Sequence, residues 1–207
     1  MLLTKDKVLQ GYSTEKYFPN MKVNKKPVED IYEAVTVPLE VLLYFDNLES
    51  PLVLVVFHAE WCGDAISTTP TILKLADSTP NLTPYLSNRD EEVDLTNTFL
   101  PDHRANTVPV FIVLDTEFKE VARFIETAKG LIPLLDDMNE TIRHQTSEDP
   151  ENRSLIRGKR TSHRVMQAKE WGSIILREFQ DVVVTGLNLP DNQRPAQGGT
   201  EWPVSGQ

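Results

Sequence analysis

The hexapeptide EWCGDA at residues 60–65 follows the apolar run LVLVVF at residues 52–57 after two residues, His58 and Ala59. The run predicts a buried strand, and the apolar spacing after Cys62 predicts a helix, so the cysteine lies at a strand-to-helix turn. The first N–H groups of a helix are unpaired, and the positive end of its dipole favours an anion. This is where a reactive thiol belongs, and Cys62 is the only cysteine in 207 residues.

The structural alternative is that Cys62 is simply a small buried hydrophobe, as free cysteines often are. Three neighbours favour the reactive interpretation. Trp61 and Gly63 are unusual in a packed strand or helix interior, Gly63 lets another backbone approach the sulfur, and Asp64 fits the first turn of a helix. We expect the helix N-terminus to outweigh the charge of Asp64, so that the pKa of Cys62 lies below that of a free thiol.

Two prolines downstream complete the pattern. Pro70 lies eight residues after the cysteine and should kink the helix predicted over residues 62–77. Val108-Pro109 precedes the apolar run at residues 110–115, and a proline is tolerated at the start of a strand, where its peptide bond can be cis. Trp-Cys-Gly, the kinking proline and the Val-Pro pair, in this order and spacing, resemble the thioredoxin-like superfamily over residues 27–145.

The resemblance implies an α/β thioredoxin fold, with a central mixed β-sheet flanked by helices, an N-terminal helical segment and a C-terminal helical extension. It implies that Cys62 is the catalytic nucleophile, and that a cis bond between Val108 and Pro109 faces it. The substrate-binding residues implied by the resemblance are Trp61, Gly63, Asp64, Val108 and Pro109.

The sequence departs from the family pattern at two positions. Ala65 stands where the family has its second, resolving cysteine, and Val56 stands where it has a buried acid. The two losses are consistent, because a buried carboxylate with no second thiol to deprotonate would only carry a desolvation cost. Asp64 also replaces a proline that is common in the family, and an anion there disfavours the thiolate.

The interpretation that follows is a thiol–disulfide oxidoreductase with a single active-site cysteine, which forms mixed disulfides resolved by an external thiol such as glutathione. The expected partners are protein or small-molecule disulfides. Two alternatives remain open: a redox-inactive binding module on the same fold, or a dithiol reductase whose resolving cysteine was replaced by Ala65.

Composition narrows the remaining possibilities. A net charge of −10 argues against nucleic acid or an anionic membrane as a partner, and no apolar run approaches the length of a membrane span. The four histidines lack ligand spacing, so we expect no metal site and no cofactor beyond the external thiol. The expected location is the cytoplasm, and the expected state is a monomer, or a dimer when Cys62 is oxidised.

The chain divides into four predicted segments: an N-terminal extension at 1–26, the thioredoxin-like domain at 27–145, a linker and packed C-terminal helix at 146–187, and a disordered tail at 188–207. The linker is predicted over 145–163 from its polar, turn-rich start, with the packed helix from Val165. A basic cluster of five residues is expected to form a solvated face. Its members are Arg153, Arg157, Lys159, Arg160 and Arg164.

Overall fold

A five-stranded mixed sheet forms the centre of the fold, in the order β2-β1-β3-β4-β5. The computed structural model describes residues 3–200. The strands are β1 (Leu52–His58), β2 (Leu82–Asn88), β3 (Val110–Leu114), β4 (Glu120–Ile125) and β5 (Ala196–Gly199). β1 runs parallel to β2 and antiparallel to β3, β4 is antiparallel to β3, and β5 is parallel to β4. The expected mixed α/β sheet is confirmed.

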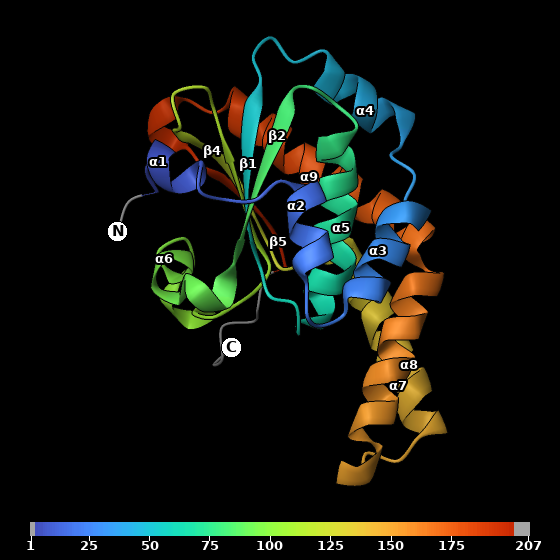
Figure 1. Ribbon diagram of the computed structural model, residues 1–207. Helices are drawn as coiled ribbons and strands as arrows, with labels where there is room; N and C mark the ends of the chain where they lie inside the picture. Colours follow the sequence, from blue (N-terminus) through green and yellow to red (C-terminus); the bar gives the residue numbers. More distant parts are fainter. Residues whose placement is uncertain (1–2, 201–207) are drawn as a thin grey trace.

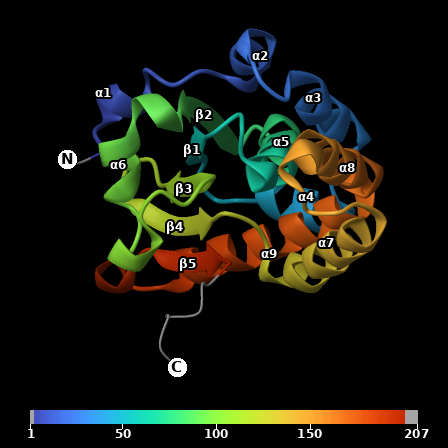
Figure 2. The ribbon, with the colours of Figure 1, turned by 90° about the horizontal axis from the view of Figure 1, so that it is seen from below.

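Helices cover both faces of the sheet (Figures 1 and 2). They are α1 (Lys5–Val8), α2 (Thr14–Tyr17), α3 (Lys25–Ala34), α4 (Leu39–Asp46), α5 (Gly63–Asp77), α6 (Val93–Asn97), α7 (Ile132–Gln145), α8 (Arg153–Met166) and α9 (Ala168–Asn188). Alternate residues of β1 serve the two faces, because successive side chains of a strand point in opposite directions. Leu54 and Val56 join the large core with α3, α5 and α9, while Val55 and Phe57 join a smaller core with α1 and α6.

The C-terminal helix α9 belongs to the large core. Trp171, Ile175, Phe179 and Val183 are buried and lie at the helical spacing seen in the sequence. Gly186 lets α9 approach β4 closely, since a Cβ at this position would lie 2.2 Å from the Val121 carbonyl oxygen.

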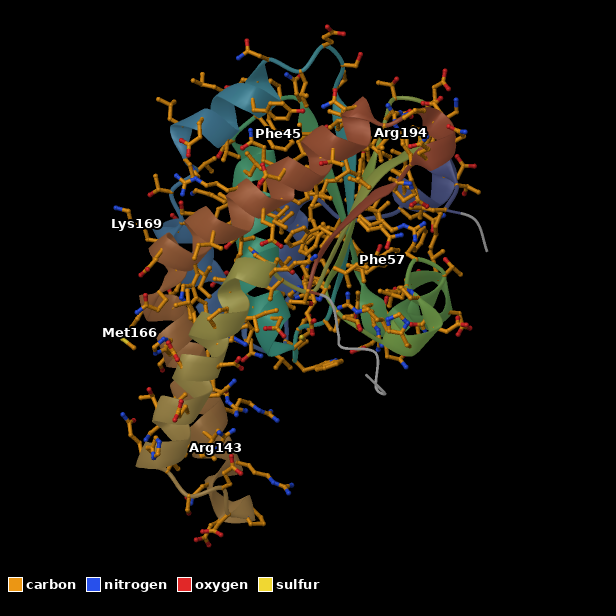
Figure 3. All side chains as sticks on the ribbon, turned by 180° about the vertical axis from the view of Figure 1, so that it is seen from behind. Phe45, Phe57, Arg143, Met166, Lys169 and Arg194 are labelled. Atoms are coloured by element: carbon orange, nitrogen blue, oxygen red, sulfur yellow. The ribbon has the colours of Figure 1, made fainter. Side chains whose placement is uncertain are left out.

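The predicted linker over 145–163 is wrong for most of its length. Only its first part is non-helical, and α8 (Arg153–Met166) forms a hairpin with α7 that extends beyond the body of the domain (Figures 1 and 3). The error has a physical cause: a largely polar helix with one buried arginine has the composition of a linker, and α8 is held by its packing on α3, α5 and α7.

The predicted disordered tail is also wrong up to residue 200. β5 forms there because its backbone pairs with β4, even though its side chains supply little apolar surface. Gly199 permits this approach, because a Cβ there would lie 2.1 Å from the Ile125 carbonyl oxygen of β4, and its φ of +89° favours glycine. Gly198 makes room for the Val182 side chain of α9. The rest of the predicted tail, residues 201–207, lies outside the described residues. Between residues 3 and 200, no helix has the length and apolar character needed to cross a membrane.

Candidate functional site

Cys62 lies at the junction between β1 and α5, at the N-cap of the helix. Its backbone N–H donates to the Ala59 carbonyl oxygen at 3.1 Å, and its own carbonyl oxygen accepts from the Ile66 N–H at 3.1 Å. The half-buried thiol donates to the Val108 carbonyl oxygen, with 3.3 Å between Sγ and oxygen. The Val108–Pro109 peptide bond is cis. The fold therefore brings together two motifs that lie 46 residues apart in the sequence.

The expectation of an acidified thiol is wrong in direction. Burial raises the pKa of Cys62, and the nearby carboxylates of Asp64 and Glu126 raise it further. The backbone N–H groups of Ala65 and Asp64 at the start of α5 lower this pKa, but they do not outweigh burial. The sequence argument weighed the helix N-terminus against Asp64 and left out burial of the sulfur.

Trp61 forms an exposed wall beside the cysteine. Its side chain is 52% exposed, and its indole Nε1–H donates to Asp90 Oδ2 at 2.8 Å. The preceding residue, Glu60, accepts from the backbone N–H groups of Lys22 and Val23 through Oε2, at 2.7 Å each. The N-terminal segment and the loop after β2 thus both fix the loop that carries Trp61.

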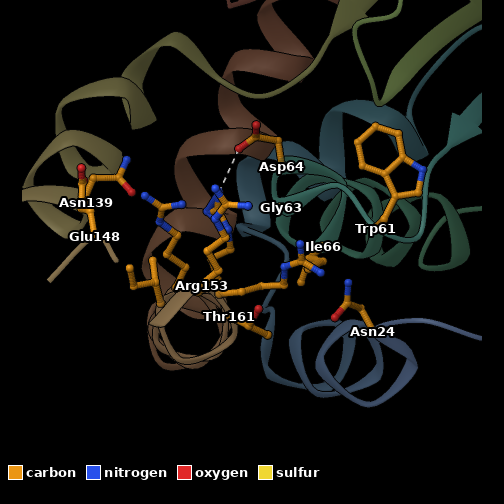
Figure 4. A pocket seen from close by; sticks show the side chains of 13 residues that line it. Asn24, Trp61, Gly63, Asp64, Ile66, Asn139, Glu148, Arg153 and Thr161 are labelled. Atoms are coloured by element: carbon orange, nitrogen blue, oxygen red, sulfur yellow. Dashed lines mark hydrogen bonds and ion pairs between the residues drawn. The ribbon is translucent and has the colours of Figure 1, made fainter. Parts of the chain in front are cut away.

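Arg164 lies beside the first turn of α5, and it is buried rather than solvated. Its guanidinium Nη2 lies 3.1 Å from Asp64 Oδ1 (Figure 4). Gly63 makes room for this guanidinium, because a Cβ at residue 63 would lie 3.1 Å from Arg164 Nη2. The sequence led us to expect a backbone segment next to Gly63, and the structure places the Arg164 side chain there instead. Burial raises the pKa of Asp64, and Arg164 opposes that rise.

A cavity of about 630 Å³ lies next to the Asp64–Arg164 ion pair, and both residues of the pair line it. Arginines of α8 line one side, and the start of α5 with Trp61 lines another (Figure 4). The lining residues are Asn24, Trp61, Gly63, Asp64, Ile66, Asn139, Glu148, Arg153, Ile156, Arg157, Arg160, Thr161 and Arg164. Arg164 Nη1 is buried in this wall and has no hydrogen-bond partner within residues 3–200.

The position of the missing second cysteine is filled by apolar packing. Ala65 is fully buried in the first turn of α5, one turn from Cys62. His58, at the end of β1, does not face the thiol in any hydrogen bond: its Nδ1 pairs with Thr69 Oγ1 at 3.0 Å, and burial lowers its pKa to about 4. In the described part of the chain, no group of three or more potential ligands could hold a metal ion.

Sequence reasoning named the Cys62 and Pro109 loops and missed Arg164 and Glu126 as groups that act on the thiol. From the sequence, Arg164 was expected in a solvated basic cluster, although the spacing of the arginines in that cluster indicated a shared helix face. Arg153, Arg157, Arg160 and Arg164 repeat at helical spacing, which places all four on one face of a helix.

A family model described as thioredoxin matches residues 11–139, beginning within the segment predicted as an N-terminal extension. A Pseudomonas aeruginosa protein of unknown function matches with a TM-score of 0.56 and 15% identity, over 81% of this chain and 95% of that one. An HIV epitope-scaffold protein matches with a TM-score of 0.49 and 15% identity, over 80% and 95% of the two chains. Mitochondrial thioredoxin 3 of Saccharomyces cerevisiae, in its oxidised form, matches with a TM-score of 0.31 and 17% identity, over 52% and 98%. No curated protein matches the sequence.

Proposed function

This chain belongs to the thioredoxin family, and from that membership we propose that it carries out thiol–disulfide exchange through one thiol, that of Cys62. The fold is the one on which thiol–disulfide oxidoreductases of this family are built. The observation that carries the proposal is the contact of Cys62 Sγ with the Val108 carbonyl oxygen, at 3.3 Å. It places the sulfur beside a backbone segment that can pair with an extended substrate chain.

The proposed reaction has three steps. Cys62 loses its proton, and the thiolate attacks one sulfur of a substrate disulfide; the substrate S–S bond breaks, and the second sulfur leaves as a thiolate that takes up a proton. An external thiolate, such as that of glutathione, then attacks the Cys62 sulfur and releases the substrate thiol. A second external thiol frees Cys62 and leaves as the symmetrical disulfide of the external thiol.

The external thiol is needed because the chain supplies no internal one. Cys62 is its only cysteine, and Ala65 occupies the resolving position. Trp61 and Pro109 shape the surface around the sulfur in this proposal, and Val108 offers its backbone to the substrate.

The test is to expose the native protein to a model peptide disulfide and to follow mixed-disulfide formation by mass spectrometry. We expect one adduct at Cys62, released by reduced glutathione, and none in a Cys62→Ser control. In Ala65→Cys we expect the adduct to be replaced by an internal disulfide. A thiol that reacts only after denaturation would contradict the proposal.

That contrary outcome would favour the second candidate, a binding module that retains the groove and not the exchange reaction. One observation supports it. Burial and the carboxylates of Asp64 and Glu126 raise the pKa of Cys62, which reduces the thiolate available at neutral pH.

A further inference from the structure

Four arginines of α8 form a stripe that begins at the candidate site. Arg164 lies against Asp64, and Arg160, Arg157 and Arg153 follow at intervals of three or four residues along the same face. Eleven residues of helix span about 16 Å. The stripe thus runs from the start of α5 along the hairpin that α8 forms with α7, and its members line the same cavity as Trp61 (Figure 4).

Within residues 3–200, three of the four arginines of this stripe have no carboxylate that neutralises their charge. The two carboxylates in the cavity wall are already engaged, Asp64 by Arg164 and Glu148 by Arg143. In the described part of the chain, no carboxylate lies within ion-pair distance of Arg153, Arg157 or Arg160.

Those three side chains are exposed, while Arg164 is only 8% exposed and its Nη1 has no partner within residues 3–200. A local row of unpaired cations in a chain of net charge −10 attracts anions that the rest of the surface repels.

We propose that this arginine stripe binds an acidic polypeptide segment next to the substrate cysteine, so that Cys62 acts preferentially on disulfides in acidic sequences. The inference rests on the proposed function for its exchange step, although the stripe can bind acidic peptide without it. The length of the stripe selects a polypeptide over a small anion. An extended chain advances about 3.3 Å per residue, so about five residues cover it. Acidic side chains within about five residues of the cysteine are therefore the ones that matter.

The experiment uses peptides with one cysteine, activated as the mixed disulfide with pyridine-2-thiol, and with acidic, neutral or basic residues at the five neighbouring positions. The Cys62 thiolate attacks the peptide sulfur, the bond to the pyridine sulfur breaks, and pyridine-2-thiol leaves and takes up a proton as its thione. Release of the thione gives the rate. We expect the acidic peptide to react at least tenfold faster than the neutral one in dilute buffer. The difference should nearly vanish in 1 M salt, where charges are screened within about 3 Å.

The stripe is tested by the triple variant Arg153→Gln, Arg157→Gln and Arg160→Gln. We expect it to lower the rate with the acidic peptide to that of the neutral peptide, and to leave the neutral rate within twofold. The matched control removes three cations elsewhere, as Lys16→Gln, Lys169→Gln and Arg177→Gln, and should retain the preference. Equal rates for acidic and neutral peptides with the native protein would overturn the proposal. The proposal would also be overturned if the triple variant lost as much rate with glutathione disulfide as with the acidic peptide, because this would indicate a subsite for small anions.

A second measurement separates this proposal from the exchange reaction. A fluorescent acidic peptide with serine in place of cysteine should bind the native protein by anisotropy and lose at least tenfold in affinity with the triple variant. If this peptide binds while no activated peptide reacts at Cys62, the proposed function fails and the acidic-segment site stands. If activated peptides react and the serine peptide shows no preference for the stripe, the site fails and the exchange function stands.

Discussion

Removing either partner of the Asp64–Arg164 pair should shift the pKa of Cys62, in opposite directions. Arg164→Gln removes a cation near the sulfur and leaves the charge of Asp64 uncompensated, so the pKa should rise. Asp64→Asn removes an anion that raises this pKa, and leaves Arg164 free to stabilise the thiolate, so the pKa should fall. A single charge at close range shifts a pKa by about 1–3 units. Each single variant leaves one charge of the pair uncompensated near a sulfur that is only half-buried, so we expect about one unit, the lower end of this range, in each direction.

The effect on reactivity at pH 7 is smaller than the shift. One unit changes the thiolate fraction about tenfold, but the nucleophilicity of a thiolate falls as its pKa falls, with a Brønsted coefficient of about 0.4–0.5. Asp64→Asn should therefore raise the rate of alkylation about threefold to fourfold, and Arg164→Gln should lower it by a similar factor. In the double variant, which carries both Asp64→Asn and Arg164→Gln, burial and Glu126 still raise the pKa of Cys62, so it should stay above that of a free thiol.

Stability gives a second, independent measure of the same pair. Two unit charges 3.1 Å apart attract by about 5 kcal/mol at an effective dielectric constant of 20, most of which is offset by desolvation of the pair. Removing one partner of a buried pair costs about 3–5 kcal/mol. The Asp64 side chain is 26% exposed, so we expect the cost of each single variant to lie at or just below the bottom of this range, at about 2–3 kcal/mol. The double variant should lose less than the sum.

The assay combines the pH dependence of alkylation by iodoacetamide with urea unfolding of the same variants. Arg177→Gln is the matched control, because its ion pair with Glu40 is exposed and solvent-screened and should contribute little to stability. A shift of the Cys62 pKa in the same direction in both single variants would refute the reasoning. So would a shift below the precision of the titration, since it would mean that the Asp64–Arg164 pair does not influence this pKa.

Three further predictions concern the core, the C-terminal helix and the lifetime of the adduct. Burial lowers the pKa of His58 to about 4, against about 6.5 in the unfolded chain, so between these pH values the unfolded chain binds more protons than the folded one. Acidification from pH 7 to 5 should therefore lower the free energy of unfolding by about 2 kcal/mol. The same measurement by urea unfolding on His58→Gln should lack this loss. Gly186→Ala forces a Cβ against the β4 backbone and should lower the melting temperature by several degrees, whereas Gly158→Ala, with open space around it, should raise stability by up to about 1 kcal/mol. A mixed disulfide at Cys62 should be released more slowly by glutathione than one on a model peptide thiol, as followed by mass spectrometry, because glutathione must attack the half-buried Cys62 sulfur, which is hard to reach.

The parts of the fold that could be predicted are those encoded by local pattern. The apolar run at residues 52–57 became β1, the helix after Cys62 became α5 with Pro70 inside it, and the apolar run at 110–115 became β3. Each of these elements has its own hydrophobic periodicity, which a single sequence displays.

The parts that could not be predicted depend on partners distant in sequence. β5 has the composition of a tail and becomes a strand because β4 offers an unpaired edge. The ion pair of Asp64 with Arg164 joins residues that lie 100 positions apart. The pairing of β5 with β4 and the ion pair of Asp64 with Arg164 each depend on a distant partner that no local sequence pattern indicates. From composition alone, the segment that forms β5 and the segment that carries Arg164 were therefore both expected to be solvated.

The charges around Cys62 indicate what a site with one cysteine does well. Burial, Asp64 and Glu126 raise the pKa of the thiol, so thiolate is scarce at neutral pH. The same shift makes the thiolate that forms a stronger nucleophile, while half-burial of the Cys62 sulfur slows the attack of an external thiol on the mixed disulfide. A dithiol site resolves that intermediate internally, whereas here Ala65 fills the position that would do so. Slow formation and slow release together favour a long-lived covalent complex with a selected substrate over rapid turnover. The arginine stripe would supply the selection, because it holds an acidic substrate beside the sulfur for the time that a scarce thiolate needs to react.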